Sequence, residues 1–184
     1  MSAVERPPVV FLDIDGVLLS RSTWDLPANV SLLREESARQ MSTWEFSDRA
    51  TFDPVAVMLV NRLCHRTGGR IVMSTSWRAS FGIPETRAKL VAEGIGDALF
   101  HADYACPLGR PLDKARDIRD WLVGNGYDIS PSAHAWIALD DDVLEGITQV
   151  TTEPMAGFGV REYRTVCAWL GGVDKDYGVW AAAA

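Results

Sequence analysis

Short apolar runs alternate along this chain with longer stretches that carry apolar residues at helical spacing. Such runs, bounded by glycine, proline or polar residues, are typical of buried strands. Strands that alternate with helices predict a mostly parallel sheet with helices on both faces. We therefore expect an α/β fold. The predicted strands lie at about 8–13, 70–74, 98–102, 135–139 and 147–151, and the predicted helices at about 53–67, 84–93, 112–123 and 160–170.

The length and composition fit a single globular domain. The chain has 184 residues, of which 47% are hydrophobic and 23% charged, as in ordinary globular proteins. We predict one domain over residues 1–175, with a cap-like or lid-like insertion at about 19–52 and a tail at 176–184. No apolar stretch reaches the ~20 residues of a membrane span, and no secretory signal is readable. We expect a cytoplasmic protein without a membrane partner.

Charge and cysteine content exclude several classes of function. The three cysteines are far apart and lack CxxC spacing, which argues against a disulfide framework and a zinc site. A net charge of -7 repels a phosphate backbone, so extended nucleic acid is not an expected partner. Four positive charges cluster near one predicted helix start, at Arg110, Lys114, Arg116 and Arg119. This local charge is enough to bind one phosphate group.

Two carboxylates follow the first predicted strand. Asp13 and Asp15 come after the apolar run 9–12 and precede Gly16, at a strand end where α/β proteins bind ligands. One carboxylate can serve as a nucleophile beside a cation, and the other can protonate a leaving group. Alone, the pattern also fits a simple turn. It does not fit an EF-hand, whose glycine comes at the sixth position.

Hydroxyl side chains follow the second predicted strand. Ser74, Thr75 and Ser76 precede Trp77 and Arg78. Hydroxyls, free N–H groups and a nearby arginine are suited to bind phosphate oxygens. The alternatives are an ordinary polar loop and, for Arg78, a surface ion pair.

A lysine and three aspartates complete the set of polar groups. Lys114 stands in the first turn of a predicted helix, where the helix dipole disfavours a cation. Pairing with a carboxylate and a bound phosphoryl group would explain a lysine at this position.

Three aspartates, Asp140, Asp141 and Asp142, follow the fourth predicted strand. Their mutual repulsion favours a divalent cation, and oxygen ligands favour magnesium. A solvated lysine and a capped acidic helix start are the alternatives.

The order of these groups resembles the haloacid dehalogenase (HAD) superfamily of aspartate-nucleophile phosphatases. Its four motifs match residues 11–17, residues 71–74, Lys114 and residues 137–141. The segments Leu12–Leu18 and Ser74–Arg78 are also similar to the small HAD domains associated with RNA repair and to nucleotidase-like relatives. The resemblance covers about residues 8–170 and implies a Rossmannoid three-layer sandwich with a small or minimal cap.

The resemblance also implies catalytic roles and a magnesium site. Asp13 would attack phosphorus to form an aspartyl-phosphate, and Asp15 would protonate the leaving oxygen and later activate water. Lys114 would balance charge and orient Asp13. Mg²⁺ would bind the Asp13 carboxylate, the Asp15 carbonyl and Asp140, with Asp141 as a second or alternative ligand.

For the substrate, the resemblance implies a phosphate contact from Ser74. Thr75 and Ser76 remain alternatives, and Arg78 would contact phosphate or sugar. Trp24 and Trp44, in the insertion, either stack on a base or fill the core of the insertion.

The expected activity is magnesium-dependent phosphomonoester hydrolysis on a nucleotide or another small phosphorylated metabolite. A polynucleotide-end (3′-) phosphatase is one alternative. A non-enzymatic, phospho-accepting module of the receiver type is another, although its acidic cluster, acceptor and lysine come in a different order.

Overall fold

The computed structural model describes residues 6–39, 41–130 and 134–171. At its centre lies a five-stranded sheet in the order β3-β2-β1-β4-β5, in which every neighbouring pair is parallel. The predicted α/β fold with a parallel sheet is confirmed. The strands are β1 (Val9–Leu12), β2 (Arg70–Met73), β3 (Phe100–Ala105), β4 (Trp136–Asp140) and β5 (Gln149–Thr151).

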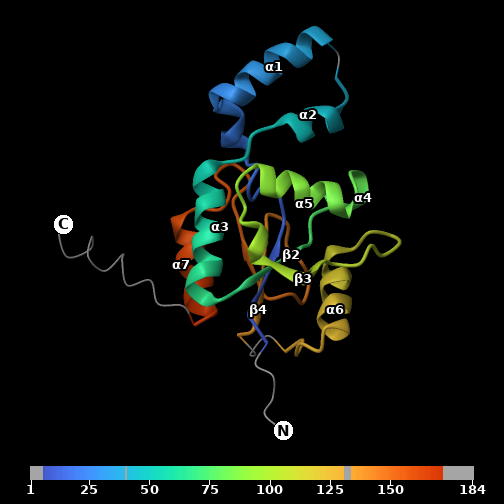
Figure 1. The fold of residues 1–184 in the computed structure, drawn as a ribbon, viewed down its shortest axis with the longest axis vertical. Helices are drawn as coiled ribbons and strands as arrows, with labels where there is room; N and C mark the ends of the chain where they lie inside the picture. Colours follow the sequence, from blue (N-terminus) through green and yellow to red (C-terminus); the bar gives the residue numbers. More distant parts are fainter. Residues whose placement is uncertain (1–5, 40, 131–133, 172–184) are drawn as a thin grey trace, which may run out of the picture.

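Helices cover both faces of the sheet, which gives three layers (Figure 1). Alternate residues of the central strand β1 face opposite sides. Val10 and Leu12 pack in one apolar core with α3 (Pro54–Thr67), α5 (Ile83–Ala92) and α7 (Val160–Trp169). Val9 and Phe11 pack in a second core with α6 (Lys114–Gly124). The continuous apolar run of β1 is therefore explained by burial on both faces.

Local capping explains why α3 begins and ends where the sequence predicts. The Asp53 side chain accepts a hydrogen bond from the Val55 N–H, and Pro54 occupies the first turn, where its missing N–H costs nothing. Gly68 ends the helix with a φ of 70°, a conformation that favours glycine.

Several elements differ from the prediction. β5 begins at Gln149 and not at residue 147, and α6 begins at Lys114 and not at residue 112. β3 spans Phe100–Ala105 and not 98–102, because residues 97–99 form a 3-10 turn, η2 (Asp97–Leu99). The helix α4 (Trp77–Ser80) was not expected, since four residues are too few to show helical periodicity.

The sequence predicts one polar helical stretch in the insertion, at 31–40, and the structure shows that the insertion at residues 19–52 is more helical than that. It holds η1 (Arg21–Asp25), α1 (Pro27–Arg39) and α2 (Thr43–Arg49). In Figure 1, α1 and α2 lie at the top of the molecule, beyond the ends toward which the parallel strands run. Trp24 stacks on Phe46 with ring centroids 5.0 Å apart. It is half-buried and packs against the main apolar core, which includes Phe46. The Trp44 side chain lies outside the described part of the structure.

Within the described ranges, no helix combines the length and the apolarity that crossing a bilayer requires. The predicted tail at 176–184 lies outside the described residues.

Candidate active site

The central pairing of β1 with β4 brings two acidic motifs to one edge of the sheet. Leu12 and Leu139 are register partners, and the Asp13 N–H donates to the Leu139 carbonyl at 3.0 Å. Asp13 and Asp140 are both buried. The Nζ atom of Lys114 lies 2.5 Å from Asp13 Oδ2 and 3.0 Å from each carboxylate oxygen of Asp140. Three side chains from β1, β4 and the start of α6 thus converge.

The charges of this group are not balanced. Burial lowers the pKa of Lys114, but the carboxylates of Asp13 and Asp140 raise it by more, so the lysine stays an ammonium ion. Burial and the charge of Asp13 raise the pKa of Asp140 to about 7 despite the nearby lysine. One ammonium group therefore does not offset the buried carboxylates, and a further positive charge would stabilise them.

A third carboxylate completes a group that could hold a metal ion. One ligand oxygen each from Asp13, Asp140 and Asp141 lies within 4.8 Å of the others. Gly16 allows this approach: it has a φ of 66°, and a Cβ atom there would lie 2.2 Å from Asp141 Cγ. Three carboxylates without histidine or cysteine form a donor set suited to a hard divalent cation.

Ser74 presents a buried hydroxyl next to this group. Its backbone N–H donates to the Leu12 carbonyl at 3.0 Å, so it sits beside Asp13 at the same sheet edge. Among the described residues, Ser74 Oγ is buried and has no hydrogen-bond partner, which is costly unless a ligand supplies one. By contrast, Thr75 Oγ1 accepts the Trp77 N–H at 3.3 Å. These contacts favour Ser74 as the phosphate contact.

Asp15 lies at the exposed side of the site. Its Oδ2 accepts a hydrogen bond of 2.8 Å from the indole Nε1 of Trp77. Desolvation raises the pKa of Asp15, and the indole hydrogen bond offsets part of that shift. A carboxyl group with a raised pKa retains its proton to a higher pH, as a general acid requires.

Arg78 corrects one prediction from the sequence. Its side chain is fully buried, and it donates to the carbonyls of Ser74 at 2.9 Å, Thr75 at 2.8 Å and Pro107 at 3.1 Å. It also lies 3.6 Å from the buried carboxylate of Asp117. Arg78 therefore supports the loop after β2 from inside the molecule. The sequence analysis indicated a substrate contact or a surface ion pair for this residue instead.

Thr152 is a supporting residue that the sequence analysis missed. Its N–H donates to the Asp140 carbonyl at 3.0 Å, and its hydroxyl donates to the Gly16 carbonyl at 2.8 Å. It therefore ties the loop after β1 to the end of β4. The sequence signal is weak, because a threonine after a short strand is common.

Comparisons with known proteins show the family of the chain. The family model of the HAD domain in Swiss Army Knife RNA repair proteins matches residues 9–162. A haloacid dehalogenase-like hydrolase from Streptococcus pneumoniae is 16% identical, with 97% of this chain and 99% of that chain covered and a TM-score of 0.48. No curated protein matches the chain significantly. The chain belongs to the HAD superfamily, in the family of HAD domains found in Swiss Army Knife RNA repair proteins.

Proposed function

We propose that this protein is a magnesium-dependent phosphomonoester hydrolase that uses Asp13 as its nucleophile and acts on a nucleotide or another small phosphorylated metabolite. One observation carries the proposal: Lys114 Nζ joins the buried carboxylates of Asp13 and Asp140, next to Ser74, whose hydroxyl has no hydrogen-bond partner in the part of the chain that the structure describes. This is a site with one nucleophile, one cation and one free donor for a phosphoryl oxygen.

The residues present fit a magnesium ion. Asp13, Asp140 and Asp141 would hold it. Burial and, to a smaller extent, the charge of Asp13 raise the pKa of Asp140, and the ion would stabilise the ionised form of this carboxylate. When bound, the ion supplies charge neutralisation between the nucleophile and the phosphate.

Asp13 and Asp15 have different roles in the proposed reaction. Asp13 Oδ1 accepts the Ile14 N–H at 2.8 Å and Oδ2 accepts from Lys114, so the nucleophile is held in a fixed orientation. Asp13 attacks phosphorus, while Asp15 gives its proton to the departing oxygen. In the second step Asp15 takes a proton from water, which attacks the phosphorus and releases Asp13.

A cavity beside Lys114 supports a substrate of nucleotide size. Its volume is about 560 Å³, and its lining includes Lys114, Arg119, Leu112 and Val143. Volumes of about 300 to 1,000 Å³ are typical of small-molecule sites. The lining also includes three acidic residues, Asp113, Asp142 and Glu145. Because these outnumber the two cations, the cavity suits an uncharged organic part of a substrate, such as a base or a sugar, and not a second anionic group.

Phosphate release from nucleoside monophosphates and sugar phosphates tests the proposal, with and without Mg²⁺. We expect magnesium-dependent turnover that Asp13→Asn reduces by about a thousandfold or more. The exposed Asp48, on α2, offers a matched control, Asp48→Asn, which should retain activity. Turnover that survives Asp13→Asn would exclude the aspartate nucleophile, and a phosphorylated protein that never turns over would favour the receiver-type module.

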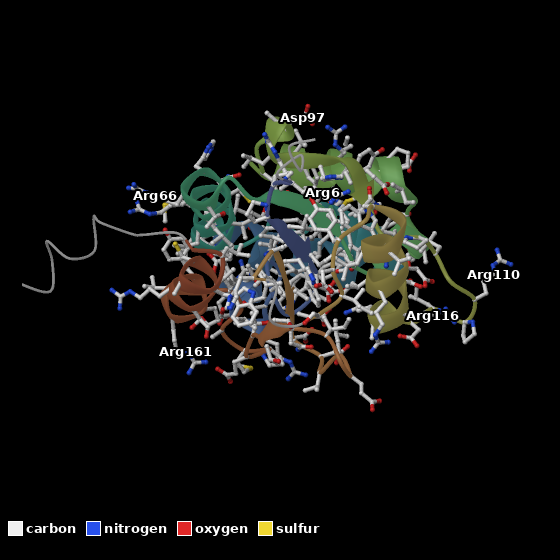
Figure 2. The ribbon with its side chains drawn as sticks, turned by 90° about the horizontal axis from the view of Figure 1, so that it is seen from below. Arg6, Arg66, Asp97, Arg110, Arg116 and Arg161 are labelled. Carbon is white, nitrogen blue, oxygen red and sulfur yellow. The ribbon has the colours of Figure 1, made fainter. Side chains whose placement is uncertain are left out.

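A polynucleotide-end phosphatase is the second candidate, because the matching family model describes domains of RNA repair proteins. Figure 2 shows Arg110 at the tip of the loop before α6 and Arg116 in the first turn of α6. Arg116 donates to the Pro111 carbonyl of the same loop, so the two arginines lie where they could contact a phosphate chain. This candidate predicts a higher kcat/KM for a 3′-phosphorylated oligoribonucleotide than for a 3′-mononucleotide. The preference should fall in Arg110→Ala/Arg116→Ala, whereas equal rates on both substrates would favour the small metabolite.

A further inference from the structure

The residue that holds Asp15 comes from a different motif. Trp77 follows the hydroxyl-rich loop after β2, and its indole Nε1 lies 2.8 Å from Asp15 Oδ2. Trp77 is 2% exposed, whereas Asp15 is exposed. A buried and immobile donor thus holds one oxygen of an otherwise solvent-facing carboxylate.

The indole has little freedom to move. It meets Phe52 edge to face at 5.9 Å and Phe81 at 4.9 Å. Its backbone N–H donates to Thr75 Oγ1, and the loop before it is fixed by hydrogen bonds from buried Arg78. Packing on two sides and a supported loop fix the rotamer of Trp77, as a well-placed supporting side chain requires.

This contact distinguishes the two oxygens of Asp15. An N–H group donates to a bare oxygen and not to a protonated one, because a hydroxyl oxygen would direct its own hydrogen elsewhere and accept less well. When Asp15 carries a proton as the general acid, Oδ1 therefore holds it, because Oδ2 accepts from the indole.

We propose that Trp77 is a positioning residue that holds Asp15 with its proton on Oδ1, directed to the leaving oxygen of the substrate. This inference rests on the proposed function. As an oxygen of Asp13 bonds to phosphorus, the bond between phosphorus and the leaving oxygen breaks. The electron pair of that bond stays on the leaving oxygen, which takes the Oδ1 proton and departs as an alcohol.

The dependence of kcat/KM on the leaving group tests the inference, because a merely structural role of Trp77 would affect all substrates equally. An alkoxide needs a proton as it departs, whereas a nitrophenolate departs as an anion and needs none. In Trp77→Phe, which keeps a ring and removes the N–H, we expect kcat/KM for glycerol 2-phosphate to fall by about tenfold or more. For 4-nitrophenyl phosphate we expect a change of less than about twofold.

Phe81→Leu is the matched control. It replaces a ring that contacts the same indole with another apolar side chain. The indole keeps its N–H, its contact with Phe52 and the supported loop before it, so we expect the hydrogen bond to Asp15 to persist. The ratio of kcat/KM between the two esters should stay at the wild-type value. Equal losses on both esters in Trp77→Phe, no loss on either, or the same change of ratio in Phe81→Leu would overturn the inference.

A spectroscopic measurement does not depend on activity or on the folding of Trp77→Phe. In protein labelled with ¹⁵N-tryptophan, Asp15→Asn should move the indole N–H resonance of Trp77 more than the other indole resonances. An unmoved spectrum overturns the inference. Wild-type protein that hydrolyses neither of these esters and none of the nucleoside monophosphates and sugar phosphates overturns the proposed function as well. Wild-type turnover with an unchanged ratio in Trp77→Phe overturns the inference alone.

Discussion

The Nζ atom of Lys114 lies 2.5 Å from Oδ2 of Asp13. The same ammonium group contacts Asp140 at 3.0 Å, so it is the cation that two buried carboxylates share. Since Lys114 is the first residue of α6, where the helix dipole disfavours a cation, these carboxylates account for its position.

Lys114→Met should therefore destabilise the metal-free protein by about 3 kcal/mol at pH 8, because it leaves buried charges uncompensated. The loss should be smaller at pH 5.5, since carboxylates whose folded-state pKa is raised contribute stability that is lost as pH increases. Urea denaturation at both pH values measures this. Asp142→Asn is the control, because Asp142 is exposed and its carboxylate lies 3.9 Å from Lys114. Equal losses at both pH values would contradict the expectation.

The pKa of Asp140 predicts how magnesium binding depends on pH. Because its folded-state pKa is about 7 against an ordinary 3.8, the metal-free protein loses stability as pH rises through about 7. Magnesium binds the ionised carboxylate, so the rise in Tm on adding Mg²⁺ should be large at pH 8 and small at pH 5.5. Differential scanning fluorimetry measures both. A rise that is independent of pH, or that persists in Asp140→Asn, would exclude this residue as the ligand.

Gly16→Ala should displace Asp141 from the acidic group, because the new Cβ would overlap its carboxylate. We expect weaker Mg²⁺ binding and at least about tenfold lower activity, with a stability loss of about 1 kcal/mol from the left-handed backbone. Gly68→Ala is the control: its φ of 70° is similar, and nothing lies within 4 Å of its Cβ position. It should lose similar stability and no activity. Titration calorimetry with Mg²⁺ separates the two variants.

Ser74→Ala should separate stability from function. The hydroxyl is buried without a partner among the described residues, so its removal should leave the free energy of unfolding unchanged or raise it by about 1 kcal/mol. Activity should fall by about tenfold or more if this hydroxyl binds a phosphoryl oxygen. Thr75→Val is the comparison, because Thr75 Oγ1 already accepts the Trp77 N–H, and it should destabilise the loop. A fully active Ser74→Ala would reassign the phosphate contact.

Arg78→Gln should lower the free energy of unfolding, because the guanidinium donates to several buried carbonyls and faces Asp117. Breaking a buried ion pair costs about 3–5 kcal/mol. Asp117→Asn should be less harmful on its own, and the double variant should be more stable than the sum of the two single losses predicts. Chemical denaturation of the four proteins measures this coupling. A stable Arg78→Gln with a raised KM would restore the predicted substrate contact.

The sequence alone determined the fold class and the order of the chemical groups. Apolar runs, helical spacing and the cap at Asp53 are local features, and parallel strands carry the residues that follow them to one edge of the sheet. This is why the positions of Asp13, Ser74 and Asp140 after predicted strands indicate that they meet. Lys114 begins a helix, and the resemblance to the HAD superfamily, which rests on the order of the groups, implied that it joins them.

Only the tertiary structure decided which supporting residues contact those groups. The contact from Trp77 to Asp15 spans 62 residues, and that from Thr152 to Gly16 spans 136. The inward direction of Arg78 depends on Asp117 in α6 and on Pro107 in the preceding loop. Side-chain direction after a short turn is set by the remote elements that pack against it, and no local pattern in the sequence records their positions.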